Sequence, residues 1–514
     1  MSTQTLLAPS RSLHNLLTQY QEIFTAIVLF AVFFIGMASV QFATADMPDN
    51  DGYYHIKLAY LMRTEGLRPA FPYLPLSILN PREFYDHHFL FHLELIPFTF
   101  GDLRLGAKWA AVTNASLAFL AVWWLLHKQK VPLAWLWALG LLAVSEAFLY
   151  RMSITRAQSL SLAVLALGLH WMFTRNYKLL LPLGFVFVWM YDAFPLLGTL
   201  AVLYTLALWI SEQRLDLRPI LYAGLGTALG LVINLYFPHN LIFIASHLLP
   251  KLTQATAVSV GNEWFPYRTS TLLENSPLSL AAFAAGMLAL GLHERRMDTR
   301  TTASLFCALL FGLMLFQARR FIEYFPPFAL LFAALAWAPL MEKLSSQPTE
   351  GRFPLDWVRP RLLAAAALAI IVAVGAWFTL PRAQSSLRAS KDYRLYAAAS
   401  QWLQENTPAG ERIFQTDWDD FPRLFFYNTH NTYLVGLDPT YMQLYDANLY
   451  DQWVSITQGE VQQPSRIIRS RFGSSYVLTD LVHEAFMLQA KNDPGMQEVY
   501  RDEDAVIYQV LVQP

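Results

Sequence analysis

Two carboxylates and a histidine stand close together in the stretch from Asp49 to His55, a few residues after a long apolar run. If a helix begins near Asp51, then Asp51 and His55 are one turn apart and share a face of that helix. Both side chains could then contact the same ligand or metal ion, and Asp51 is the candidate catalytic carboxylate. The alternative is that Asp51 only caps the helix and that His55 lies at a membrane interface.

A second group of polar residues precedes another apolar stretch. Asp86 and His87 are followed by His88 and His92, so that an acid and three histidines are close together in the chain. Aspartate and histidine can ligate a divalent ion, and they can also bind a phosphate or a sugar hydroxyl. The spacing is not that of a zinc signature. The alternative is the start of an interfacial helix that the histidines cap.

Three arginines are candidates for binding an anion. Arg319 and Arg320 stand together between two apolar runs, and Arg156 lies in the turn after another run. The guanidinium fork matches the oxygen atoms of a phosphate, so the pair could clamp a diphosphate. One of the two could instead form a local ion pair with Glu323.

Two further candidates are acids beside aromatic residues. Glu263 lies in an aromatic-rich stretch from Val258 to Tyr267. An aromatic belt at the membrane interface explains the aromatic residues but does not need the glutamate. Trp418 and Asp419 come soon after a predicted strand, where α/β folds place their ligands. An ordinary acidic turn is the alternative there.

The elements that must hold these residues are mainly transmembrane helices. The chain has 514 residues, of which 55% are hydrophobic and 15% charged, whereas soluble domains have about 25% charged residues. A helix needs about 20 apolar residues to cross a bilayer. Apolar runs predict about eleven spans, at residues 24–44, 106–126, 131–150, 158–174, 179–191, 193–211, 219–237, 277–292, 302–318, 325–341 and 362–380.

The charges of the loops predict the orientation, because lysine and arginine stay on the cytoplasmic side. Basic residues recur in alternate loops, which places the N-terminus in the cytoplasm. The loops 45–105 and 238–276 are then on the outer side. Arg151, Arg156 and the arginine pair break the rule on that side, which suggests an anionic ligand there.

The composition after residue 381 is that of a soluble domain. Residues 391–406 predict an amphipathic helix, residues 475–479 a strand, and residues 505–512 an edge strand. Alternation of helices and strands predicts a small α/β domain over residues 382–514, on the outer side. Residues 1–381 would form the transmembrane domain.

Several of these stretches resemble the catalytic subunits of oligosaccharyltransferases, which belong to the GT-C superfamily of polyprenol-dependent glycosyltransferases. Asn50-Asp51-Gly52-Tyr53 is similar to the first acidic motif of the family, and Val260 to Glu263 is similar to an outer-loop motif that ends in a glutamate. Arg320 falls where the family has a diphosphate-binding arginine. Asp417 to Phe421 resembles the family's Trp-Trp-Asp-Tyr-Gly motif. The order of the segments resembles the family over most of the chain, whereas the amino-acid sequence itself is similar only in a few short motifs.

The resemblance implies an integral membrane glycosyltransferase with a GT-C transmembrane fold and an extracytoplasmic α/β domain. The donor would be a sugar or oligosaccharide on a polyprenyl phosphate or diphosphate. Asp51 would be the catalytic carboxylate, and Arg320, with Arg319 or Arg156, would neutralise the leaving phosphate. The location would be a bacterial inner membrane, with the domain in the periplasm.

The resemblance also implies a divalent metal, Mg²⁺ or Mn²⁺, held by Asp51, Glu263 and Asp86. The sequence departs from the family in the turn after the third predicted span. Arg156 stands there in place of the second acidic motif. Other GT-C enzymes work without a metal, so glycosyl transfer does not depend on this site.

The other candidates are assigned to the substrates. His55, Asp86 and His87 would position the donor or acceptor, and Trp418 and Asp419 would contact the acceptor. Because the tryptophan motif is altered, the acceptor could be a protein, a lipid or a glycan.

Two alternatives belong to other functional classes. A transporter or flippase for a lipid-linked glycan would have ionisable residues in the middle of its spans, and these spans have few. A non-catalytic scaffold could have kept the fold after losing the second acidic motif. The net charge of −1 gives no basic field for binding nucleic acid.

Overall fold

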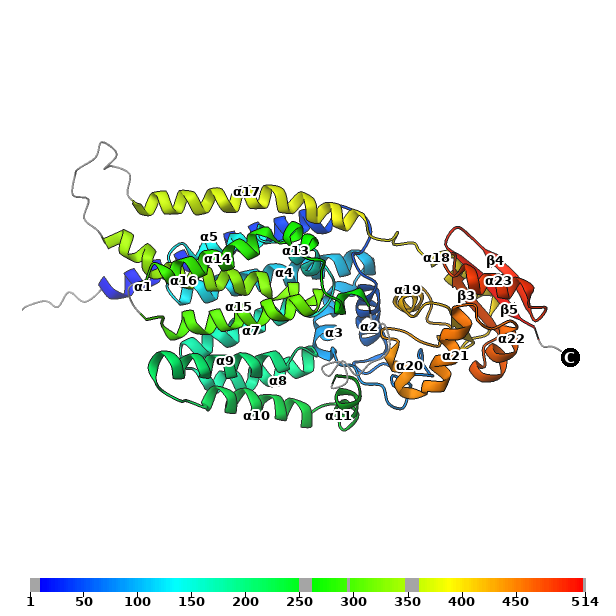
Figure 1. Ribbon diagram of the computed structural model, residues 1–514. Helices are drawn as coiled ribbons and strands as arrows, with labels where there is room; N and C mark the ends of the chain where they lie inside the picture. The colour runs from blue at the N-terminus through cyan, green and yellow to red at the C-terminus, as the bar shows by residue number, and fades with distance from the viewer. Residues whose placement is uncertain (1–9, 249–260, 294–295, 347–359, 512–514) are drawn as a thin grey trace, which may run out of the picture.

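A computed structural model describes residues 10–248, 261–293, 296–346 and 360–511. Long helices lie side by side in one bundle, and a smaller domain with a β-sheet covers one end of it (Figure 1). The long helices of the bundle are α1 (Ser10–Gln41), α4 (Leu103–Lys128), α7 (Gln158–Phe173), α8 (Leu180–Met190), α9 (Pro195–Glu212), α10 (Arg218–Val232), α14 (Pro277–Gly291), α15 (Thr299–Gln317), α16 (Phe325–Ser346) and α17 (Pro360–Arg388). α17 continues past the domain boundary that the sequence predicts at residue 381.

The expected count of about eleven spans is not confirmed. Among the described residues, six helices are long and apolar enough to cross a membrane. The count becomes seven if α13 (Thr269–Asn275) and α14, which meet at an angle of 85°, form one broken span. Four more apolar helices are shorter, and these include α7 and α10.

The predicted span 131–150 is not one helix. It breaks into α5 (Ala134–Leu139), the 3₁₀ turn η2 (Gly140–Leu142) and the start of α6 (Glu146–Met152). The break has a local cause, because the Ser145 side chain accepts a hydrogen bond from the backbone N–H of Phe148 and so starts a new helix.

Short elements fill the space between the bundle and the small domain. The loop after α1 contains α2 (Asp51–Glu65), α3 (Phe89–Leu95) and η1 (Ile96–Thr99). The other short elements of the bundle are η3 (Tyr177–Leu179), α11 (His239–Phe243), η4 (Ile244–Leu248), η5 (Asn262–Trp264) and η6 (Arg319–Glu323). In Figure 1, α2, α3 and α11 lie at the end of the bundle that faces the domain.

The C-terminal sheet has five strands in the order β2-β1-β3-β5-β4. β1 is parallel to β2 and β3, whereas β5 is antiparallel to β3 and β4. The strands are β1 (Arg412–Gln415), β2 (Thr432–Tyr433), β3 (Tyr476–Asp480), β4 (Met496–Arg501) and β5 (Ala505–Val510), and the helical elements are α18 (Ala397–Asn406), η7 (Trp418–Asp420), α19 (Phe421–Tyr427), α20 (Thr440–Tyr445), α21 (Ala447–Thr457), α22 (Pro464–Ile467), η8 (Ile468–Phe472) and α23 (Glu484–Asn492). The prediction that the last strand is an edge strand is therefore wrong, because β4 takes the edge and β5 is paired on both sides.

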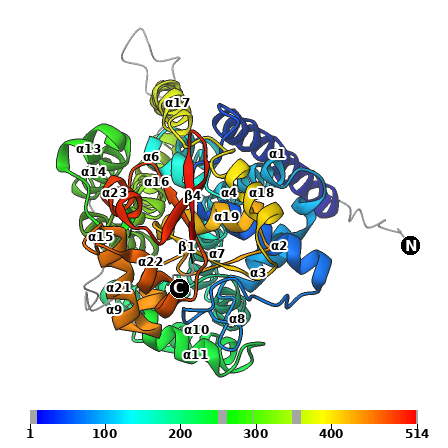
Figure 2. The same ribbon diagram turned by 90° about the vertical axis from the view of Figure 1, so that its right-hand side faces the viewer.

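One apolar core joins the small domain to the loop after α1. Tyr54 and Phe71 from that loop pack with Phe421 and Phe425 of α19. Figure 2 looks onto the domain along the bundle and shows α19 next to α2. The shared core holds the acidic turn of the domain against the beginning of α2.

Candidate functional site

Asp51 is the first residue of α2, and its carboxylate forms an ion pair with Arg156 (Oδ2 to NH2, 3.1 Å). The residue at the cap position is Asn50, so the structure does not support the alternative that Asp51 is only a cap. The Asp51 backbone N–H donates to Oδ1 of Asp49 (2.8 Å). This contact keeps a second carboxylate beside the first.

Asn50 links the start of α2 to the C-terminal domain. Its Nδ2 donates to Oδ2 and to the backbone oxygen of Asp419 (2.8 and 3.0 Å). Its Oδ1 accepts a hydrogen bond from Nε of Arg423 (2.7 Å). Arg423 is almost fully buried and lies over the ring of Tyr53. Asp419 therefore lies next to Asn50 and Asp51, although it follows them in the chain by hundreds of residues.

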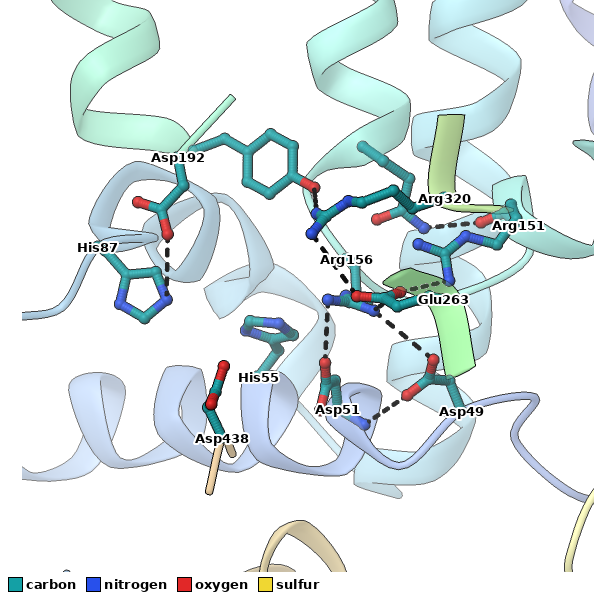
Figure 3. A network of polar contacts seen from close by, with 12 residues as sticks. Asp49, Asp51, His55, His87, Arg151, Arg156, Asp192, Glu263, Arg320 and Asp438 are labelled. Carbon is teal, nitrogen blue, oxygen red and sulfur yellow. Dashed lines mark hydrogen bonds and ion pairs between the residues drawn. The ribbon is translucent and has the colours of Figure 1, made fainter. Parts of the chain in front are cut away.

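Arg156 lies among three carboxylates from two distant parts of the chain. Besides Asp51, its NH1 group is 3.7 Å from Oδ2 of Asp49 and 3.3 Å from Oε2 of Glu263. Figure 3 shows the guanidinium between these acids. Arg156 comes from the turn before α7, where the resembled family has its second acidic motif.

Glu263 lies on η5 and contacts three arginines. Its Oε2 is 2.9 Å from NH1 of Arg151 and 3.3 Å from NH1 of Arg156, and its Oε1 is 3.7 Å from NH1 of Arg320 (Figure 3). Arg320 also donates to the hydroxyl group of Tyr191 (3.3 Å). The three arginines thus meet at Glu263, beside the carboxylates of Asp49 and Asp51.

Glu323, the alternative ion-pair partner expected for Arg319 or Arg320, pairs with Arg151 instead. Its carboxylate accepts hydrogen bonds from Nε and NH2 of Arg151, and it is 1% exposed. Arg320 stacks over the ring of Trp264 (4.3 Å to the centroid). Arg319 donates to the backbone oxygen of Pro266. Arg319 and Arg320 therefore do not act as one pair. Arg320 contacts Glu263, whereas Arg319 contacts the backbone of the loop at Pro266.

The histidine cluster forms a hydrogen-bonded chain. Nδ1 of His92 donates to Oδ2 of Asp86 (2.8 Å), and Nδ1 of His55 shares a hydrogen bond with Nε2 of His92 (2.7 Å). All three side chains are buried. His87 lies 3.7 Å from the carboxylate of Asp192. Figure 3 shows His55 and His87 on the same side of the network as Asp51.

The pKa values separate the acids of the network. Burial raises the pKa of Asp51 to about 7, although the positive charge of Arg156 lowers it. The negative charges of Asp49, Glu263 and Asp419 also raise this pKa and offset part of the effect of Arg156. Burial also raises the pKa of Asp419, to about 6. For Glu263 burial acts in the same direction, but the three arginines outweigh it and hold the pKa well below its usual value. Glu263 is ionised at neutral pH, whereas Asp51 can gain or lose a proton there.

Trp418 lies beside the loop that carries Glu263. A Cβ placed on Gly261 would be 3.8 Å from Cη2 of the indole. Trp418 and Asp419 therefore border the site from the domain side.

The residues predicted to hold a metal do not fit one. Asp51 and Glu263 share Arg156, whereas Asp86 accepts hydrogen bonds from His92 and from the backbone N–H of His88. In the described part of the chain, no group of three His, Cys, Asp or Glu side chains is arranged to hold a metal ion. A cation is already present among the acids, and it is a guanidinium.

The sequence alone does not identify several members of the network. Arg151 is noticed as a basic residue on the outer side, but nothing pairs it with Glu323 and Glu263. Arg423 gives no signal, because only folding brings α19 to Asn50.

No protein-family model matches the chain. The chain is 26% identical over 213 residues to the dolichyl-phosphooligosaccharide-protein glycotransferase 3 of Archaeoglobus fulgidus, and the match covers 40% of this chain and 24% of that protein. The structure of this chain is similar to that of the oligosaccharyltransferase AglB of the same archaeon, in complex with an inhibitory peptide and a dolichol-phosphate. The TM-score is 0.64 at 13% identity, over 92% of this chain and 72% of that one.

The structure is also similar to that of ArnT from Cupriavidus metallidurans, bound to undecaprenyl phosphate. Here the TM-score is 0.57 at 16% identity, over 95% of this chain and 97% of the other. Both neighbours have a GT-C fold. This chain has the GT-C fold. The Asp51 network of this GT-C chain lies where the helix bundle meets the C-terminal domain.

Proposed function

We propose that this chain is an integral membrane glycosyltransferase, which moves a sugar or oligosaccharide from a polyprenyl-phosphate or diphosphate donor to an acceptor. The observation that carries the proposal is the ion pair between a titratable carboxylate, Asp51, and Arg156, which lies beside the other arginines of Glu263 at the covered end of an apolar bundle. The neighbouring structures hold dolichol-phosphate and undecaprenyl phosphate, which supports a lipid-linked donor.

In the proposed reaction, the acceptor attacks the anomeric carbon of the donor sugar and inverts its configuration. Asp51 takes the proton of the attacking group, and a pKa near the working pH suits a general base. The bond between the anomeric carbon and the phosphate oxygen breaks as the new bond forms. Arg320 and Arg156 stabilise the negative charge that develops on the leaving phosphate.

The acceptor would approach from the C-terminal domain. Trp418 and Asp419 border the site there, and Asn50 fixes Asp419 beside Asp51. His55 lies near Asp51 and His87 faces Asp192 (Figure 3), and both histidines would bind sugar hydroxyl groups. We further propose that this end of the bundle faces the periplasm of a bacterial cell, with the N-terminus in the cytoplasm.

The decisive test is the replacement Asp51→Asn, which keeps the shape of the side chain and removes the base. Loss of general-base catalysis costs about 10²- to 10⁴-fold in rate. Lipid-linked glycans from a deletion strain, analysed by mass spectrometry, would identify the intermediate that accumulates and hence the donor. Complementation with the Asp51→Asn gene should leave the intermediate in place, while the wild-type gene should remove it. Removal by a well-folded variant would refute the role of Asp51.

A further inference from the structure

Three guanidinium groups converge on the single carboxylate of Glu263. Arg151 comes from α6, Arg156 from the turn before α7, and Arg320 from η6. Their side chains are between 11% and 19% exposed. A convergent group of shielded arginines is what a phosphate needs, because the guanidinium forks match its oxygen atoms. Figure 3 shows the glutamate in the middle of this group.

The arginines are held in place by partners other than Glu263. Arg151 is bound by Glu323, Arg156 by Asp51, and Arg320 by the hydroxyl of Tyr191. These contacts remain if Glu263 moves away. The three guanidiniums form a preorganised anion site rather than a group that Glu263 alone assembles.

Glu263 is the member of this group that can leave most easily. Its side chain is 23% exposed, more than those of the three arginines. It lies on η5, a turn of three residues, none of which is buried. Moving it exposes little apolar surface, so the cost is mainly the loss of its ion pairs.

We propose that Glu263 occupies the position of the donor phosphate and that the lipid-linked phosphate displaces it on binding. The inference rests on the proposed function and adds to it that Glu263 holds the phosphate position until the donor binds. Like the carboxylate, the phosphodiester of a polyprenyl-phosphate sugar is singly charged. Exchange with that donor therefore leaves the charge of the site unchanged, whereas a diphosphate donor or undecaprenyl phosphate itself adds negative charge.

The test measures the binding of undecaprenyl phosphate to the purified full-length chain in detergent, with no sugar and no acceptor present. Glu263→Gln keeps the size of the side chain and removes the competing charge. We expect this variant to bind the lipid about tenfold more tightly than the wild type, which corresponds to about 1.4 kcal/mol. Glu263→Ala should behave in the same way, so the result does not depend on one variant.

The matched control is Glu274→Gln, which removes one negative charge from an exposed residue of the neighbouring helix α13. Its affinity should equal that of the wild type. Weaker or equal binding by both Glu263 variants would overturn the inference while leaving the lipid donor in place. If neither the wild type nor any variant binds undecaprenyl phosphate, the proposed donor class fails together with the inference. Thermal unfolding of each variant verifies that it is folded.

Discussion

Asp51 gains and loses its proton near neutral pH because two opposing effects act on one carboxyl group. Burial and the surrounding acids raise its pKa, and the ion pair with Arg156 lowers it. The result, a pKa of about 7, is well above that of an ordinary aspartate. The same three-carboxylate setting would attract a divalent ion if Arg156 were absent, because acids that face each other need a cation. In the folded chain, the cation among these carboxylates is the guanidinium of Arg156.

At the residue scale, we predict that glycosyl transfer falls as the pH is lowered through about 7. Protonation of Asp51 removes the base, so the rate should drop about tenfold for each pH unit below the pKa. The measurement is the initial transfer rate between pH 5 and pH 9. The binding of undecaprenyl phosphate over the same range serves as the control. A rate that stays constant down to pH 5 would exclude Asp51 as the titrating base.

The same ionisation has a consequence for stability. The pKa of Asp51 is raised from 3.8 to about 7 in the folded chain, so the folded state holds its proton more tightly. This contribution is fully present below about pH 4 and is lost as the pH rises through 7. Asp51→Asn does not titrate, and its melting temperature relative to the wild type should therefore be higher at pH 8 than at pH 5.

At the scale of elements, helices α8 and α10 approach so closely that glycine is required at their contact. A Cβ on Gly226 would lie 2.1 Å from the backbone oxygen of Leu181. Small residues allow this kind of approach between helices in membranes. Gly224, on the same helix, has no atom within 4 Å of the position of its Cβ.

This difference gives a matched pair of substitutions. Gly226→Ala should lower the melting temperature of the purified chain, because the backbone of α8 would have to move and overpacking costs about 1–3 kcal/mol. Gly224→Ala should leave it unchanged or raise it, since alanine favours a helix by about 1 kcal/mol over glycine. Equal melting temperatures for both variants would contradict the close packing of α8 on α10.

The link between α2 and α19 shows how an element can be positioned by one polar side chain. Asn50 joins the acidic turn of η7 to the guanidinium of Arg423. The aromatic core around Phe425 then holds the helices together. Any movement of the C-terminal domain would therefore be transmitted directly to the first turn of α2, which carries Asp51.

At the scale of the whole molecule, the site and the C-terminal domain lie at one end of the bundle, and the α9–α10 loop lies at the other (Figure 1). We predict that the two ends are on opposite sides of the membrane. Cysteine in place of Val482, which is 83% exposed in the domain, should react with a membrane-impermeant maleimide in intact cells. Cysteine in place of Leu215, which is 64% exposed in the α9–α10 loop, should react only after permeabilisation.

Cys307 does not interfere with this measurement. It is the only cysteine of the chain and is fully buried. The reverse labelling pattern would invert the proposed topology, and labelling of both positions in intact cells would contradict it.

The sequence by itself determined which segments are apolar and where the soluble composition begins, because local hydrophobicity depends only on neighbouring residues. It also pointed to Asp51, Glu263 and Arg320 through short motifs that resemble the GT-C family. It did not determine the span count, since several apolar runs fold into shorter helices, α7 and α10 among them, and the run 131–150 breaks into separate elements. Nor did the sequence show that the last strand, β5, is an inner strand of the sheet. Its position depends on pairing with β4, which forms the edge.

Only the tertiary structure decided the partners of the charged residues. Arg156, in the turn before α7, meets Asp51 from the loop after α1 and Glu263 from η5, although no sequence pattern joins them. The Asp86–His92–His55 chain likewise appears only when α2 and α3 pack together. A charge can pair with any opposite charge that folding brings near it. Its identity can therefore be read from the sequence, but its partner has to be read from the fold.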